Sequence, residues 1–197
     1  GACHSTANTL RPCLQVIKTA PGTKLVSAFF LMEVPNCDLG DNGTFVFADC
    51  GLNQNPNPEE LAAIAVSSAE SFKMLTGHEP KVAMLSHSSK GSAKHADVDK
   101  VVEATRIAKE MAPELALDGE LQLDAAIVPE IGASKAPDSK VAGHAIFKYL
   151  LYKFFVVSTG PSRSFIGNMV STENQRCNAV NIMTPYNKFK EITLNFP

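Results

Sequence analysis

A polar loop near the middle of the chain has the residue types of an anion-binding site. The apolar run Val82–Leu85 predicts a strand, the sequence SHSSKGSAK follows at 86–94, and a helical pattern begins near Asp97. In a strand–loop–helix unit, backbone N–H groups and the helix N-terminus can converge on one anion. Gly91 permits a positive φ, the serine hydroxyls can donate, and two lysines add positive charge. The loop is typical either of a phosphate site or of a solvated turn.

The other standard signatures of catalysis are missing from the sequence. The loop lacks the G-x-x-x-x-G-K-[ST] spacing of a Walker A motif, and no G-x-S-x-G, G-x-G-x-x-G or H-E-x-x-H pattern occurs. His87 stands between two serines, but neighbours in sequence do not make a catalytic triad. The pair Cys3-His4 is too short a pattern to indicate a metal site. We therefore predict no bound metal, and these patterns identify no catalytic residue.

A second candidate anion ligand is Arg11. Apolar residues at helical spacing predict a short helix within residues 1–21, with its buried face at Leu10, Leu14 and Ile17. Ser5, Thr6 or Asn8 could cap its start, and Pro12 is tolerated only in the first turn. Arg11 would then lie near the helix N-terminus, where a cation is unfavourable unless an anion is close. We expect Arg11 either to share a crevice with Lys90 or to be an ordinary surface arginine.

Alternating strand and helix patterns predict the elements that position these groups. We expect an antiparallel pair of strands at 26–33 and 44–49, and a helix at 57–77 with clear start and stop signals. A second long helix is expected at 96–111, a further strand at 121–128, and a short helix from Pro129. The inward residues of the second long helix are expected to be Val98, Val101, Val102, Thr105 and Ala108. This order predicts an α/β fold with a mainly parallel sheet covered by helices. Ligands of such sheets bind beyond the carboxyl ends of the strands, where the loop lies.

Composition narrows the class of partner. The chain has 197 residues and a net charge of −2, so no basic excess favours nucleic acid or an anionic membrane. No apolar run reaches the roughly 20 residues that span a bilayer. Five cysteines form an odd count without a C-x-x-C pair, which argues against a disulfide framework and is typical of a reducing cytoplasm.

The composition changes after Gly143. Residues 144–197 hold only two of the 20 acidic residues but six of the 18 Lys and Arg, together with all three tyrosines. We predict a division into residues 1–143, an α/β domain, and residues 144–197, a divergent tail. A shifted reading frame, a degraded gene end or disorder would each account for such a tail.

Residues 1–143 resemble the phosphate acetyltransferase (phosphotransacetylase) family. The resemblance lies in several long blocks that occur in the family's order: GACHSTANTLRP, VFADCGLN, VAMLSHSSKGSAK, VDKVVEATRIAKE, DGELQLDAAIVP and SKAPDSKVAG. It implies the later part of a longer, two-domain chain with an isocitrate/isopropylmalate dehydrogenase-like fold, and a homodimer. It also implies reversible acetyl transfer between acetyl-CoA and inorganic phosphate, with coenzyme A as substrate and no permanently bound cofactor.

The resemblance assigns binding roles to two groups of residues. The first is His4, Ser5, Thr6 and Arg11, and the second is Ser88, Ser89, Lys90, Gly91 and Ser92. Cys37 matches a position near the family's active site, without a sign that it is a nucleophile.

The end of the chain departs from the family. The family's Ser-Arg pair and catalytic aspartate are absent; Arg176 is the candidate for the arginine, and Asn181 stands where the acid is expected. We therefore expect reduced activity or none, and leave the catalytic base unassigned. A phosphate butyryltransferase, a non-catalytic CoA-binding or regulatory module and an unstable remnant remain the alternatives.

Overall fold

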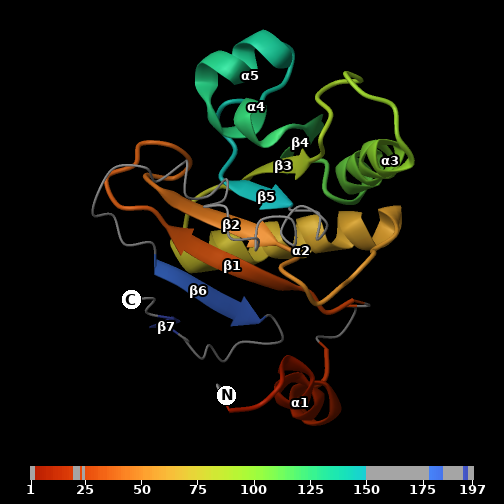
Figure 1. Cartoon of the computed structure of the whole chain (residues 1–197), viewed down its shortest axis with the longest axis vertical. Coiled ribbons are helices and arrows are strands. Elements are labelled where there is room, and N and C mark those ends of the chain that lie inside the picture. The colour runs from red at the N-terminus through yellow and green to blue at the C-terminus, as the bar shows by residue number, and fades with distance from the viewer. Residues whose placement is uncertain (1–2, 20–22, 24, 150–177, 184–192, 195–197) are drawn as a thin grey trace, which may run out of the picture.

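A mixed seven-stranded sheet forms the centre of the protein (Figure 1). The computed structural model describes residues 3–19, 23, 25–149, 178–183 and 193–194. The strands lie in the order β4-β3-β5-β2-β1-β6-β7. In chain order they are β1 Ala28–Glu33, β2 Thr44–Ala48, β3 Lys81–Leu85, β4 Ala116–Leu121, β5 Phe147–Tyr149, β6 Asn178–Met183 and β7 Thr193–Leu194. Strands β4, β3, β5 and β2 run parallel, whereas β1, β6 and β7 add antiparallel pairs.

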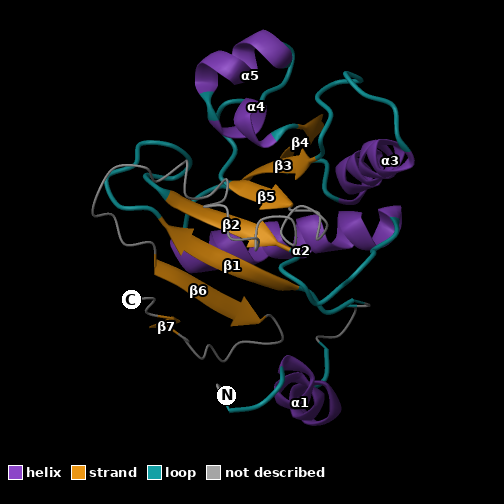
Figure 2. Ribbon diagram, in the orientation of Figure 1, coloured by secondary structure: helices purple, strands orange, loops and turns teal. Residues whose placement is uncertain are grey.

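Helices cover both faces of the parallel part (Figure 2). The helices of the described residues are α1 Thr6–Pro12, the π-helical turn η1 Cys13–Ile17, α2 Pro58–Thr76, α3 Ala96–Met111, α4 Leu123–Ile127 and α5 Pro129–Lys135, and α1 and η1 lie away from the sheet. In β3, Val82 and Met84 pack in one core cluster with residues of α2 and α3, whereas Ala83 and Leu85 pack with residues of α4. Because side chains alternate along a strand, α2 and α3 cover one face and α4 the other. The α/β class is confirmed.

Several predicted elements are confirmed. Helix α2 starts with a capping box, in which Asn57 Oδ1 accepts from the Glu60 N–H at 2.8 Å, and it ends at Gly77 with φ +75°. Strands β1 and β2 pair antiparallel. Helix α3 has the predicted bounds, but the inward position of Val102 is wrong, since its side chain is exposed and Ala104 is buried instead. Val102 falls at the margin of the buried stripe.

The strand expected at 121–128 is wrong. Strand β4 ends at Leu121, and helix α4 begins at Leu123. A short apolar run has no periodicity that separates a strand from a buried helix, and two alanines favour the helix here. The apolar pattern does not indicate strand β4, because the acidic residues Asp118 and Glu120 lie within it and both are buried.

The first helix differs from its prediction. Ser5 caps α1, but Pro12 stands at the last position of the helix rather than in the first turn, and the chain continues as a π-helical turn. Proline lacks the N–H of a regular helix, which favours this irregularity. Leu10 is buried, whereas Leu14 and Ile17 are 43% and 57% exposed, so the predicted buried face is wrong for these two. Arg11 lies in the last turn, where a cation is favourable, so the electrostatic argument for a nearby anion is also wrong.

The chain continues into the sheet beyond the composition change at Gly143. Ala145 and Ile146 are buried, and β5 lies between β3 and β2. Asn181 lies on β6 opposite Phe30 of β1. Arg176 lies outside the described residues.

Candidate functional site

The loop between β3 and α3, residues 86–95, lies at the carboxyl edge of the parallel strands (Figure 1). The chain turns there through Lys90 with φ +48° and Gly91 with φ +82°. Glycine adopts this left-handed conformation at little cost. The adjacent strand β4 ends at the same edge, so its last residues lie against the loop.

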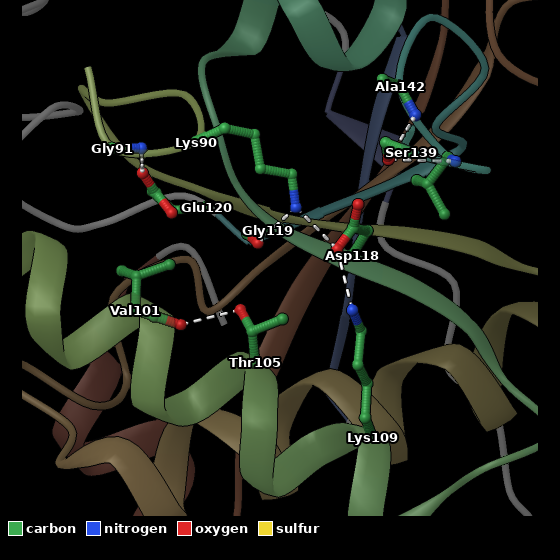
Figure 3. A network of polar contacts seen from close by, with 11 residues as sticks. Lys90, Gly91, Val101, Thr105, Lys109, Asp118, Gly119, Glu120, Ser139 and Ala142 are labelled. Atoms are coloured by element: carbon green, nitrogen blue, oxygen red, sulfur yellow. Dashed lines mark hydrogen bonds and ion pairs between the residues drawn. The ribbon is translucent and has the colours of Figure 1, made fainter. Parts of the chain in front are cut away.

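Glu120 of β4 receives the inner hydrogen-bond donors of the loop. Its Oε1 accepts from the Gly91 N–H at 2.7 Å and from the Ser88 hydroxyl at 2.9 Å, and its backbone oxygen accepts from the Lys90 N–H at 3.2 Å. Figure 3 shows the contact between Gly91 and Glu120. Ser88 is fully buried and Glu120 is 4% exposed. The negative group bound by the inner side of the loop is therefore a carboxylate of the chain itself.

The remaining backbone donors of the loop are also used within the chain. The Ser88 N–H donates to the Ser86 hydroxyl, the Ser89 N–H to the Ser92 hydroxyl, the Ser92 N–H to the Ser89 oxygen, and the Ala93 N–H to the Ser88 hydroxyl. With Lys90 and Gly91, every N–H from residue 88 to 93 has a partner in the protein. The expected convergence of loop amides on an external anion is thus not the arrangement found. The exposed side chains of the loop remain its contact surface.

Gln122, immediately after β4, holds the first half of the loop. Its N–H donates to Ser89 Oγ at 2.8 Å, and its Nε2 donates to the His87 oxygen at 3.1 Å. Lys135 of α5 donates to Gln122 Oε1 at 2.9 Å, which fixes the amide from the other side. Together with the contacts of Glu120, these bonds tie residues 87–91 of the loop to the end of β4.

Asp118 binds two lysines at once (Figure 3). Lys90 Nζ and Lys109 Nζ each lie 2.9 Å from Asp118 Oδ1, and Lys90 Nζ also donates to the Gly119 oxygen at 2.9 Å. Burial raises the pKa of Asp118, but hydrogen bonds from the Ser139 hydroxyl and from the two lysines outweigh it and lower the pKa to about 2. Asp118 is therefore ionised at neutral pH, and the Lys90 ammonium points back to β4.

The outer surface of the loop carries imidazole and ammonium groups. His87, Lys94 and His95 are exposed, and the two imidazole rings meet edge to face at 5.8 Å. His95 Nδ1 accepts from the Asp97 N–H at 3.1 Å and so caps α3. Because they are exposed, these side chains can meet a ligand from solvent.

The two predicted groups of site residues lie at different places. His4 and Ser5 precede helix α1 and Arg11 belongs to it, and Figure 1 shows α1 at the opposite end of the molecule from the β3–α3 loop. The expected crevice shared by Arg11 and Lys90 is not formed in this structure. Leu14, Val16 and Ile17 are exposed and Leu10 is buried, so little apolar surface of the first helical segment is buried.

A cysteine at the same edge of the sheet is not activated. Burial raises the pKa of Cys50 to about 12, and the neighbouring Asp49 carboxylate adds to the increase. The Cys50 thiol is therefore protonated near neutral pH. Cys37, by contrast, is partly buried in the turn between β1 and β2. Within the described ranges, no three His, Cys, Asp or Glu side chains gather in a way that could hold a metal ion.

Residues 1–147 match a family model described as "Phosphate acetyl/butaryl transferase". The chain belongs to this family. It is 65% identical over 145 residues to the phosphate acetyltransferase of Acetivibrio thermocellus, which covers 74% of the chain and 44% of the relative. It is 52% identical to that of Bacillus subtilis, over 74% of the chain and 43% of the relative. The chain thus spans less than half the length of these relatives.

Solved structures of the same family share the fold. A phosphotransacetylase from Streptococcus pyogenes superposes with a TM-score of 0.70 at 45% identity, over 90% of this chain and 52% of that one. The EutD phosphotransacetylase from Staphylococcus aureus gives 0.65 at 45% identity, over 76% of this chain and 44% of that one. No helix in the described part of this phosphate acetyl/butyryl transferase family member is both long and apolar enough to cross a membrane.

The sequence pattern did not predict the β4 side of the site in this family member. Asp118, Glu120 and Gln122 hold Lys90, Gly91 and Ser89 respectively. The available signal was the spacing of two residues from Asp118 to Glu120 to Gln122, which is the period of a strand and alternates with Leu117, Gly119 and Leu121. Their acidity concealed the strand.

Proposed function

We propose that this chain carries out reversible acetyl transfer between acetyl-CoA and inorganic phosphate, as a phosphate acetyltransferase. The observation that supports it is the family match over residues 1–147, which includes both predicted groups of binding residues. In the direction of acetyl-CoA synthesis, the CoA sulfur attacks the acetyl phosphate carbonyl. The C–S bond forms, the C–O bond to phosphate breaks, inorganic phosphate leaves, and the thiol proton passes to a base.

In this proposal, the anionic substrates meet two groups of residues. The β3–α3 loop, with Ser88, Ser89, Lys90, Gly91 and Ser92, forms the phosphate side, and His4, Ser5, Thr6 and Arg11 form a second binding group. Electrostatic attraction to the exposed Lys94 would favour phosphate. Arg176 is proposed for the role of the family's catalytic arginine. The substrates are coenzyme A, acetyl-CoA, phosphate and acetyl phosphate, without a permanently bound cofactor.

We also propose the finer features that the family resemblance implies. These are a two-domain dehydrogenase-like architecture of the longer family chain, a homodimer and a cytoplasmic location. The boundary of the family-like part is placed after residue 143, and the match to the family model ends at residue 147. A nucleotide sequence that, in another frame, continued with family-like residues would support the shifted reading frame for the tail.

A non-catalytic CoA-binding module is the second candidate. It is favoured by the separation of Arg11 from the β3–α3 loop, because acyl transfer requires both substrates to be held in one place. Such a module would bind CoA without phosphate-dependent turnover.

Initial rates of CoA release from acetyl-CoA, measured with and without phosphate, test the proposal. The 197-residue chain is expected to release CoA only when phosphate is present, more slowly than a full-length relative. The variant Lys90→Ala should lower this rate, whereas Lys73→Ala, an exposed lysine of α2, should not. CoA binding without any phosphate-dependent release would overturn the proposal in favour of the module.

A further inference from the structure

Glu120 occupies an unusual position for an acidic residue. It lies in a strand, is 4% exposed, and is in contact with the loop to which a phosphate is proposed to bind. A buried carboxylate is costly unless its charge is matched by hydrogen bonds. Here a single oxygen, Oε1, accepts both the Gly91 N–H and the fully buried Ser88 hydroxyl.

These bonds fix the conformation of the loop. Gly91 has φ +82° and follows Lys90 with φ +48°, so the chain reverses at the point that Glu120 binds. The Ser88 hydroxyl also accepts from the Ala93 N–H at 3.1 Å, and it thereby joins the start of the loop to its end. Removing the acceptor on Glu120 would leave the Gly91 N–H and the Ser88 hydroxyl without their shared partner.

We propose that Glu120 is a positioning residue for phosphate binding by the β3–α3 loop. Its carboxylate accepts hydrogen bonds from the Gly91 N–H and the Ser88 hydroxyl and so fixes the conformation of the loop. His87 and Lys94 then lie on the exposed side. The phosphate binds on that side and does not contact Glu120. This inference rests on the proposed phosphate role of the loop and names the residue that prepares it.

The charged side chains between the loop and β4 agree with this role. Lys90 and Lys109 both bind Asp118, and Glu120 is satisfied by neutral donors. Lys90 is therefore engaged with β4, while Lys94 is exposed. A loop held in this way offers an anion a fixed set of side chains, so little ordering is required on binding.

The test compares Glu120→Gln with Glu120→Leu. An amide oxygen can accept the same two hydrogen bonds as Oε1, whereas leucine has a similar size and no acceptor. Glu70→Leu, on the exposed side of α2, is the matched control. Binding of inorganic phosphate is followed by titration while the Gly91 amide resonance is observed, and the unfolding midpoint of each variant is measured separately.

We expect the wild type, Glu120→Gln and Glu70→Leu to bind phosphate with similar affinity, and Glu120→Leu to bind at least about ten-fold more weakly. The Gly91 proton resonance should move upfield in Glu120→Leu. If Glu120→Leu does not fold, Glu120→Ala replaces it, because it also removes the acceptor without adding a bulky apolar group, and weaker phosphate binding is again expected. Equal phosphate affinity in wild type and in the folded variant would overturn the inference, as would a wild type that does not bind phosphate.

Failure of the proposed function gives a different result. A wild type that binds phosphate through the loop, loses affinity in Glu120→Leu and yet shows no acetyl transfer would refute the enzyme and leave the positioning role in place. Where turnover is present, Glu120→Leu should raise the KM for phosphate without raising that for acetyl-CoA. A general loss of folding would not separate the two constants.

Discussion

The side chains of Lys90 and Asp118 tie the candidate phosphate loop to the neighbouring strand, with Nζ 2.9 Å from Oδ1. Asp118 is 11% exposed at its side chain, and the same oxygen also binds Lys109 of α3. One carboxylate thus connects the loop, strand β4 and helix α3. The position of the loop depends on contacts between segments far apart in sequence.

Replacing Asp118 by asparagine should destabilise the fold. Asp118→Asn keeps the size of the side chain but removes the charge that pairs with Lys90 and Lys109, and hydrogen bonds to charged groups are worth about 1.5–3 kcal/mol each. We expect the free energy of unfolding to fall by about 2 kcal/mol in urea denaturation. The control Asp124→Asn removes a more exposed ion pair with Lys135 and should cost less. Equal losses in the two variants would contradict a special role for Asp118.

The pH dependence of stability should show the same group. The pKa of Asp118 is lowered to about 2 in the folded protein, below its value in the unfolded chain. Its contribution to stability is therefore present above roughly pH 4 and is lost as the pH falls toward 2. Wild type should lose about 2 kcal/mol more than Asp118→Asn over this interval, as measured by denaturation at each pH. Parallel pH curves for the two proteins would argue against the lowered pKa.

Gly119 lies where a side chain does not fit. A Cβ there would lie 2.6 Å from Met84 Cβ and 2.7 Å from Thr105 Oγ1, and Thr105 is held by a hydrogen bond to the Val101 oxygen. Gly119→Ala should destabilise the protein by about 1–3 kcal/mol, because strand β4 must move away from β3 or α3. Thermal unfolding measures the loss. Adding Thr105→Ala removes one of the two clashes, so the double variant should lose less than the sum of the single losses; strict additivity would show that Thr105 is not the obstacle.

The start of helix α2 offers a further test. Asn57 Oδ1 accepts from the Glu60 N–H at 2.8 Å, and Glu60 Oε2 accepts from the Asn57 N–H at 2.9 Å. Asn57→Ala should lower the free energy of unfolding by about 1 kcal/mol, because the first turn loses its capping acceptor. Gln54→Ala, an exposed residue of the preceding loop, is the control. Equal stability of both variants would show that the cap contributes little.

Local sequence signals predicted the elements whose causes are local. The cap at Asn57 and the stop at Gly77 predicted the bounds of α2, and the apolar stripe of α3 predicted that helix. The turn-rich segment before Thr44 indicated the β1–β2 pair. The same reasoning failed for β4, since its buried acids Asp118 and Glu120 are stabilised by residues of the β3–α3 loop and of α3. The hydrophobic pattern of a segment gives no information about hydrogen-bond partners elsewhere in the chain.

In the candidate site, too, the features with local causes were predicted and those that depend on distant residues were not. The strand–loop–helix unit and its lysines were visible in the sequence, but the use of the loop amides was not, because Glu120 approaches from a strand that is 29 residues further along. The sequence pattern also did not predict the position of Arg11 relative to the β3–α3 loop. That position depends on how α1 connects to the sheet, and Leu14 and Ile17 had indicated a burial that is absent.

Acetyl phosphate formation tests the central claim most directly. The 197-residue chain is incubated with acetyl-CoA and inorganic phosphate, and free CoA and acetyl phosphate are measured in the same sample. The family membership and the phosphate role of the loop predict equal amounts of the two products, both dependent on phosphate and both reduced in Lys90→Ala. Absence of acetyl phosphate, or CoA release that is the same without phosphate, would contradict the claim.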